Sequence, residues 1–233
     1  MSAIENKPAI WQRHLPRPRI DSHKYDRGHV AVLGSETYTG ATRLAAEASS
    51  RIGAGLVSVI ADQALRVYQT SLPADIMVQN RRVTDLNRVT CVLAGPGGCT
   101  EGQSAELLTL SASIAKVLDA VAISLAERVP KQASNLIITP HDGEFDRQFP
   151  GVEGQRVERA LLVANRIGGI CVLKGPNTVI AGPNGECRIT AHASPWLAKA
   201  GTGDVLAGLI AGFTAQGMAC GSMESLGASL GQD

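Results

Sequence analysis

The sequence lacks the features that mark several classes of protein. Its 22 Lys and Arg are balanced by 21 Asp and Glu, so a net charge of +1 indicates neither nucleic acid nor an anionic membrane as a partner. The longest apolar stretch, residues 205–213, is far shorter than a bilayer span, and the first residues contain no apolar signal core. Five cysteines without a C-x-x-C pair argue against a disulfide framework or a zinc cluster. These absences predict a soluble, cytoplasmic protein.

The common phosphate-binding and hydrolase motifs are also absent. There is no G-x-x-x-x-G-K-[ST] loop, no G-x-S-x-G elbow and no H-E-x-x-H pair. Residues 95–100 and 53–58 each fail G-x-G-x-x-G at its last position. These absences argue against a Walker-type nucleotide loop and against a nicotinamide dehydrogenase of the Rossmann type. Five histidines with no clustered carboxylate–histidine set argue against a metal held in a protein cage, so metal ligands stay unassigned.

What the chain does contain is an alternation of strands and helices. Most of the β-rich runs are continuously apolar, as expected for strands covered on both faces. Such alternation predicts right-handed βαβ crossovers and a mostly parallel sheet. A Gly-Pro-Asn-Gly turn at 182–185 predicts a hairpin. The expected strands are 29–33, 56–60, 90–94, 114–118, 136–139, 170–174, 178–181 and 187–190, and the expected helices are 40–52, 101–110 and 155–167.

Small and polar residues follow four of the expected strands. They occupy residues 34–41, 95–98, 140–145 and 174–178. Each segment alone is better explained by an ordinary turn or a solvated loop. Because the carboxyl ends of parallel strands meet at one edge of a sheet, together they predict a nucleotide-sized cleft there.

A short segment near the end of the sequence, residues 200–208, has the pattern of a helix start that binds an anion. Gly201, Thr202 and Gly203 precede Asp204, and Asp204 opens an apolar run. Free N–H groups at a helix start attract phosphate, and glycines let it approach closely. Asp204 is also placed to act as a base on a bound hydroxyl. The alternative is an ordinary acidic helix start beside a tight turn.

Several segments in a fixed order resemble the NAD(P)H-hydrate dehydratase family, carbohydrate-kinase-like enzymes of the ribokinase-like fold. The resemblance spans about residues 23–217. It implies a three-layer α/β/α fold with a mostly parallel central sheet and a C-terminal β-hairpin. The segments that carry it include Tyr38-Thr39-Gly40-Ala41, Gly95-Pro96-Gly97, Thr139-Pro140-His141-Asp142-Gly143-Glu144-Phe145, Val172-Leu173-Lys174-Gly175 and Gly201-Thr202-Gly203-Asp204-Val205-Leu206-Ala207-Gly208.

The resemblance implies a nucleotide-repair enzyme. The expected reaction is ADP- or ATP-dependent dehydration of the S form of NADH or NADPH hydrate (NADHX, NADPHX), with phosphate and AMP or ADP as products. Mg2+ is the expected cofactor. Asp204 is the expected base and Gly201, Thr202 and Gly203 the expected anion cradle. The nucleotide is expected at Lys174, Gly175, Pro176, Asn177, Thr178 and Gly203, and the hydrate at Ala41, Gly97, His141 and Asp204.

Two departures from the family pattern keep alternatives open. Val121 stands where the family usually has a second aspartate, and the tail at 221–227 does not resemble the family's further helices. One alternative is a ribokinase-like kinase of a small vitamin alcohol. Another is a nucleotide-binding homologue with impaired catalysis. We expect residues 1–25 to form an N-terminal leader over the surface and residues 26–233 the dehydratase domain. A second copy of the chain, in a homo-oligomer, and an NAD(P)H-hydrate epimerase are the expected partners.

Overall fold

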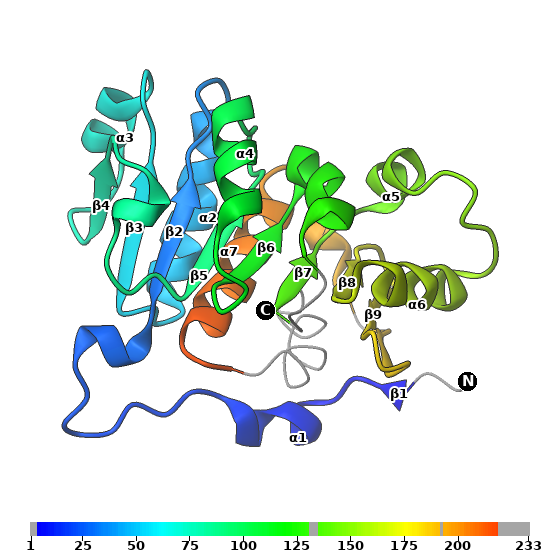
Figure 1. Ribbon diagram of the computed structural model, residues 1–233. Helices are drawn as coiled ribbons and strands as arrows, with labels where there is room; N and C mark the ends of the chain where they lie inside the picture. The colour runs from blue at the N-terminus through cyan, green and yellow to red at the C-terminus, as the bar shows by residue number, and fades with distance from the viewer. Residues whose placement is uncertain (1–3, 131–134, 192, 219–233) are drawn as a thin grey trace.

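The computed structural model describes residues 4–130, 135–191 and 193–218, and these form one ten-stranded sheet flanked by helices (Figure 1). The strand order is β1-β10-β9-β8-β7-β6-β5-β2-β3-β4. Pairing is parallel from β4 to β8, antiparallel on both sides of β9, and parallel between β10 and β1. The strands are β1 (Ile4–Glu5), β2 (His29–Leu33), β3 (Leu56–Ile60), β4 (Ile76–Gln79), β5 (Cys91–Ala94), β6 (Ala115–Leu118), β7 (Leu136–Ile138), β8 (Ile170–Leu173), β9 (Thr178–Ala181) and β10 (Cys187–Thr190).

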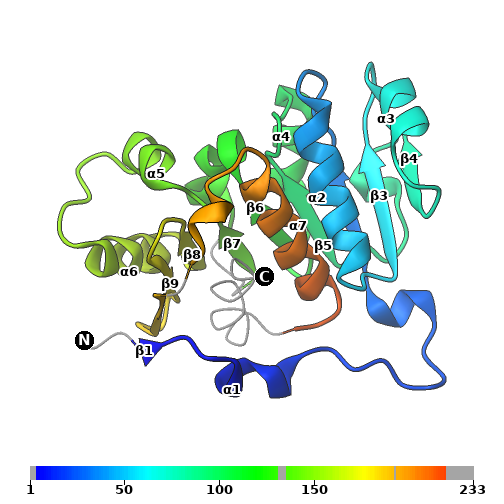
Figure 2. The ribbon, with the colours of Figure 1, turned by 180° about the vertical axis from the view of Figure 1, so that it is seen from behind.

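Helices cover both faces of the sheet and so make three layers (Figures 1 and 2). One face carries α2 (Thr39–Arg51), α3 (Leu65–Ser71) and α7 (Thr202–Ala215), which Figure 2 shows in front of the sheet. The other face carries α4 (Glu101–Thr109), α5 (Asp142–Gln148), α6 (Arg156–Ile167) and the 3-10 helix η4 (Ala120–Arg128).

The hydrophobic core lies in two parts, one on each side of the sheet. Side chains alternate along β2, so Val30 and Val32 join the cluster beneath α2 and α7, while Ala31 and Leu33 join the cluster beneath α4, α5 and α6. Because both faces are covered, all five residues of β2 are buried. This accounts for the continuous apolar runs of the sequence.

The N-terminal residues do more than lie over the surface. Residues 4–27 run past the end of the sheet where the parallel strands begin, and β1 pairs with β10 (Figures 1 and 2). Trp11 and Leu15 pack against the core. This segment also contains α1 (Pro8–Trp11) and the 3-10 turns η1 (Gln12–His14) and η2 (Lys24–Arg27). The division between a leader and a domain at residue 25 stays a prediction.

The expected mostly parallel α/β fold with its hairpin is confirmed, and the expected helices and strands are present within about a residue or two at each end. The sequence patterns missed β1, β4, α1, α3, α5 and all five 3-10 helices of the described residues, η1, η2, η4, η3 (Val83–Asp85) and η5 (Pro195–Leu197). Where a loop was expected at 140–145, His141 caps α5 instead, its Nδ1 accepting from the N–H groups of Gly143 and Glu144. The tail at 221–227 lies outside the described residues.

Candidate active site

The carboxyl ends of the parallel strands bring together charged groups from three segments. Lys174, directly after β8, places its Nζ 2.8 Å from Oδ1 of Asp119, which follows β6. The same Nζ lies 3.8 Å from Oε2 of Glu144, in the first turn of α5. A β carbon added to Gly203, in the first turn of α7, would lie 3.3 Å from this ammonium group. The lysine therefore reaches the helix start that the sequence singled out.

Asp204 lies in the first turn of α7, just after that helix start. Gly201 caps the helix with φ +93°, a left-handed conformation that favours glycine. Burial raises the pKa of the Asp204 carboxyl, and the negative charges of Asp119 and Glu144 add to this increase. The Lys174 ammonium opposes it. A carboxyl with a raised pKa is a stronger base once it is ionised, which suits it to take a proton from a hydroxyl.

The segment 174–178 forms a tight turn at the same edge. The Thr178 hydroxyl donates to the Gly175 carbonyl at 2.9 Å and accepts from its N–H at 3.3 Å. Arg156 supports the turn from α6, because its Nη2 donates to the carbonyls of Leu173 at 3.0 Å and Lys174 at 3.1 Å. Its Nη1 pairs with the carboxylate of Asp142. Pro176 and Asn177 are exposed at the tip of this turn.

Hydrogen bonds connect the segments that follow β2 and β5. The Ser35 hydroxyl donates to the Gly97 carbonyl at 2.7 Å, and the Thr42 hydroxyl donates to the Pro96 carbonyl at 2.9 Å. A β carbon on Gly97 would lie 2.2 Å from the Tyr38 carbonyl oxygen, so only glycine fits there. Ala41 lies half-buried in the first turn of α2, beside these loops.

Close backbone approaches connect the loops to the charged cluster. A β carbon on Gly95 would lie 1.8 Å from the Asp119 carbonyl oxygen, and one on Gly201 would lie 2.6 Å from Leu44 of α2. His141 lies next to Lys174, because the Lys174 N–H donates to the Pro140 carbonyl at 2.8 Å. The structure thus places all the predicted site residues along one edge of the sheet, although their roles stay predictions.

Asp119 and Glu144 are the charged residues of this cluster that sequence reasoning did not select. Glu144 stands in one of the segments that carry the family resemblance, and each of the two residues follows an expected strand, which is the signal that would have identified them. Val121, which departs from the family pattern, is 54% exposed, and the Asp119–Lys174 pair forms without a second aspartate. Among the described residues, no group of three or more His, Cys, Asp or Glu could hold a metal ion.

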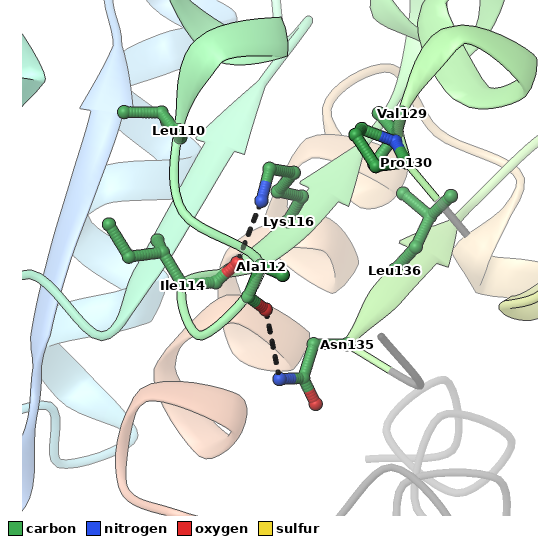
Figure 3. Close-up of a pocket in the computed structure, with 8 residues that line it drawn as sticks. All are labelled: Leu110, Ala112, Ile114, Lys116, Val129, Pro130, Asn135 and Leu136. Atoms are coloured by element: carbon green, nitrogen blue, oxygen red, sulfur yellow. Dashed lines mark hydrogen bonds between the residues drawn. The ribbon is translucent and has the colours of Figure 1, made fainter. Parts of the chain in front are cut away.

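A cavity at the opposite end of β6 is unrelated to this cluster (Figure 3). Its volume is about 10 Å³, enough for roughly one water molecule. Lys116 lines it and donates from Nζ to the carbonyls of Ser111 and Ile114, both at 3.0 Å. Burial lowers the pKa of this lysine.

Within the described part of the chain, no helix has the length and apolar character needed to cross a membrane.

Comparisons with known proteins agree with this geometry. A family model described as NAD(P)H-hydrate dehydratase matches residues 29–230. The bifunctional NAD(P)H-hydrate repair enzyme Nnr of Thermosynechococcus vestitus is 34% identical over 227 residues, which cover 89% of this chain and 45% of that protein. Nnr of Coxiella burnetii is also 34% identical, over 91% of this chain and 46% of that protein. The chain therefore spans about half the length of these curated relatives.

One solved structure is similar over nearly the whole chain. It is the ADP/ATP-dependent NAD(P)H-hydrate dehydratase from Bacillus subtilis, co-crystallised with ATP and Mg2+. The TM-score is 0.82 at 28% identity, and the match covers 99% of this chain and 87% of that one.

Proposed function

Because the chain belongs to the NAD(P)H-hydrate dehydratase family, we propose that it repairs the S form of NADH or NADPH hydrate by dehydration that depends on ADP or ATP. The observation that carries the proposal is the position of Asp204. This partly buried carboxylate lies at a glycine-flanked helix start, and the Lys174 ammonium lies over the neighbouring Gly203. A base, an anion cradle and a cation therefore meet at one point, as phosphoryl transfer requires.

The first step is transfer of a phosphoryl group to the hydroxyl on the hydrated ring. Asp204 takes the hydroxyl proton while the ring oxygen forms its bond to the terminal phosphorus of the nucleotide, and AMP or ADP leaves. The N–H groups around Gly201, Thr202 and Gly203 receive the charge of the transferring group. Lys174 adds a positive charge on the side facing Gly203. In the second step the ring carbon–oxygen bond breaks, phosphate leaves, and loss of a ring proton restores the dihydronicotinamide.

The remaining site residues bind rather than react. The turn from Lys174 through Gly175, Pro176 and Asn177 to Thr178 holds the nucleotide, and Ala41, Gly97 and His141 hold the hydrate. Mg2+ fits as an ion that enters with the nucleotide, held by phosphate oxygens and water, since the described residues offer no cage of three protein ligands. When bound, it supplies positive charge to the phosphates.

The proposal extends to partners and location. We infer that an NAD(P)H-hydrate epimerase supplies the S form, since the relatives twice as long as this chain are named bifunctional repair enzymes. A homo-oligomer and a cytoplasmic location are further proposals. Light scattering on the purified chain tests the oligomer, and one molecule per particle would contradict it.

The test mixes the protein with chemically hydrated NADH, Mg2+ and either ADP or ATP. We expect dihydronicotinamide absorbance to return with one phosphate released per molecule repaired. Asp204→Asn should slow turnover by about a hundredfold or more, because the general base is lost. Asp85→Asn, an exposed carboxylate in η3, is the matched control and should act like the parent. Nucleotide binding without repair would instead support the impaired homologue, and phosphorylation of a vitamin alcohol would support the kinase.

A further inference from the structure

Asp119 is a buried carboxylate, and one of its two oxygens has two partners inside the protein. The residue is only 3% exposed. Its Oδ1 accepts from Lys174 Nζ at 2.8 Å and from the Thr139 hydroxyl at 2.7 Å. Burying an ionised carboxylate is costly unless it is paired and hydrogen-bonded, so a structure that needed only packing would place an apolar side chain here. The Asp119–Lys174 ion pair therefore indicates a role other than stabilising the fold.

The backbone around Asp119 is strained in a way that keeps the carboxylate in place. The next residue, Ala120, has φ +46°, which is unfavourable for a residue with a β carbon. Gly95 gives the Asp119 carbonyl the room it needs, since any β carbon at Gly95 would overlap that oxygen. Strain of this kind persists where the surrounding structure holds it, and it gathers at functional sites.

Lys174 has more than one negative partner within reach. Its ion pairs within 4.0 Å are with Asp119 and Glu144, yet its ammonium also lies over Gly203, the residue before Asp204. We propose, building on the function proposed above, that Asp119 is a positioning residue that holds the Lys174 ammonium beside the phosphate path and away from Asp204. Asp204 then remains free to accept the hydroxyl proton, and the lysine remains free to meet the phosphoryl group.

The alternative arrangement would be poor for catalysis. A direct pair between Lys174 and Asp204 would lower the pKa of the base, because an opposite charge within about 4–6 Å favours the ionised form. It would also use up the cation that the phosphoryl group needs. Replacing Asp119 by the isosteric, neutral Asn removes the nearer of the two carboxylate partners, leaves only the longer pair with Glu144, and lets Lys174 move toward Asp204.

The decisive experiment is a double-mutant cycle that needs no turnover. The pKa of Asp204 is measured by carboxyl 13C NMR in the ligand-free protein, with its signal identified by Asp204→Asn. We compare the change in this pKa when Asp119→Asn is introduced into the parent protein and when it is introduced into the Lys174→Gln variant. The glutamine keeps a hydrogen-bond donor at position 174 but carries no charge. If Asp119 positions Lys174, Asp119→Asn should lower the pKa of Asp204 by about one unit or more in the parent, and by clearly less in the Lys174→Gln background. Equal falls in both backgrounds, or no fall in the parent, would overturn it.

Kinetics give a second, independent readout. In Asp119→Asn we expect kcat to fall about tenfold or more, with the acidic limb of its pH profile moved to lower pH, because Asp204 is a weaker base. The shift of this limb should be clearly smaller when the same substitution is made in Lys174→Gln, because the direct loss of the Asp119 charge acts in both backgrounds and the movement of Lys174 acts in the parent only. Glu127→Gln, an exposed carboxylate in η4, should change none of these quantities.

A structural role alone would leave the pH limb in place, and a direct charge effect of Asp119 alone would move it equally in both backgrounds; either result would overturn the proposal. If the parent protein fails to repair the hydrate, the proposed function fails, while the NMR cycle still decides the role of Asp119.

Discussion

The contact between α2 and α7 offers a direct test of how the site is positioned. Gly208 of α7 faces α2 so closely that an added β carbon would lie 2.2 Å from the Ala45 carbonyl oxygen and 2.9 Å from its Cα. Ser49 of α2 bridges the two helices, because its hydroxyl donates to the carbonyls of both Ala45 and Gly208 at 2.9 Å. The backbones therefore touch with no side chain between them, and α7 carries Asp204 at its start.

Gly208→Ala should destabilise the protein despite the better helix propensity of alanine. An ordinary carbon–oxygen contact requires the helices to separate locally by roughly 1 Å, and overpacking of this kind costs about 1–3 kcal/mol. The propensity gain of alanine offsets about 1 kcal/mol of that cost. Because the clash is with the backbone of Ala45 and not with a flexible side chain, the cost of overpacking lies at the upper end of this range, at about 2–3 kcal/mol. We expect a net loss of about 1–2 kcal/mol, which for a chain of this size lowers Tm by roughly 2–4 °C per kcal/mol.

The assay is urea unfolding followed by circular dichroism, with Gly102→Ala as the matched control. Gly102 lies in α4, is exposed, and has only the Thr100 hydroxyl near an added β carbon, at 3.9 Å. The same substitution should therefore stabilise the protein there by about 0.5–1 kcal/mol. If Gly208→Ala were as stable as the parent, the close approach of the two helices would be refuted. Repair activity should fall with stability, because the start of α7 moves.

Three further predictions concern the same edge and the buried polar groups. Gly95→Ala should cost at least about 2 kcal/mol, whereas Gly151→Ala, with φ +80° and open space around it, should cost only about 1 kcal/mol in thermal unfolding. Burial lowers the pKa of His29 despite its hydrogen bond to a backbone carbonyl, so folding disfavours its charged form. The stability that neutral His29 contributes is fully present above pH 6.5, the ordinary pKa of histidine, and is lost as the pH falls below that value. The free energy of unfolding should therefore fall less steeply with acid in His29→Gln than in the parent. Parallel curves of unfolding free energy against pH would contradict this. Arg156→Lys should raise the nucleotide KM several-fold with little change in kcat, because lysine cannot donate to two carbonyls and a carboxylate from one planar group; an unchanged KM would show that Arg156 does not shape the turn.

Local sequence patterns predicted most of the fold. Continuous apolar runs such as 29–33 predicted strands buried on both faces, and the alternation with helices predicted a parallel sheet. The short elements were missed for a physical reason. β1 and β4 are the two edge strands of the sheet; both residues of β1 are exposed and only the first residue of β4 is buried, so neither has the continuous buried run that marked most of the other strands. α5 was hidden because its polar first turn is typical of a loop.

Most residues of the candidate site were named from the sequence, with Asp119 and Glu144 as exceptions, but the contacts among them were not. Glycines and an aspartate before an apolar run indicated an anion site at Asp204, since a helix start has the same unpaired N–H groups wherever it occurs. The sequence could not show that Lys174, 30 positions earlier, reaches over Gly203, or that its charge is held by Asp119. Those contacts depend on strand order, which places β6 and β8 on either side of β7.

The sequence by itself determined which chemical groups the protein can use and where its strands and helices form. Periodicity, turn residues and helix-start chemistry are local, so they can be read from neighbouring positions. Only the tertiary structure decided which charges meet, because packing in three dimensions sets the distances over which charges act. It placed one lysine among the carboxylates of Asp119, Glu144 and Asp204, with direct pairs to the first two only, and burial then raised the pKa of Asp204.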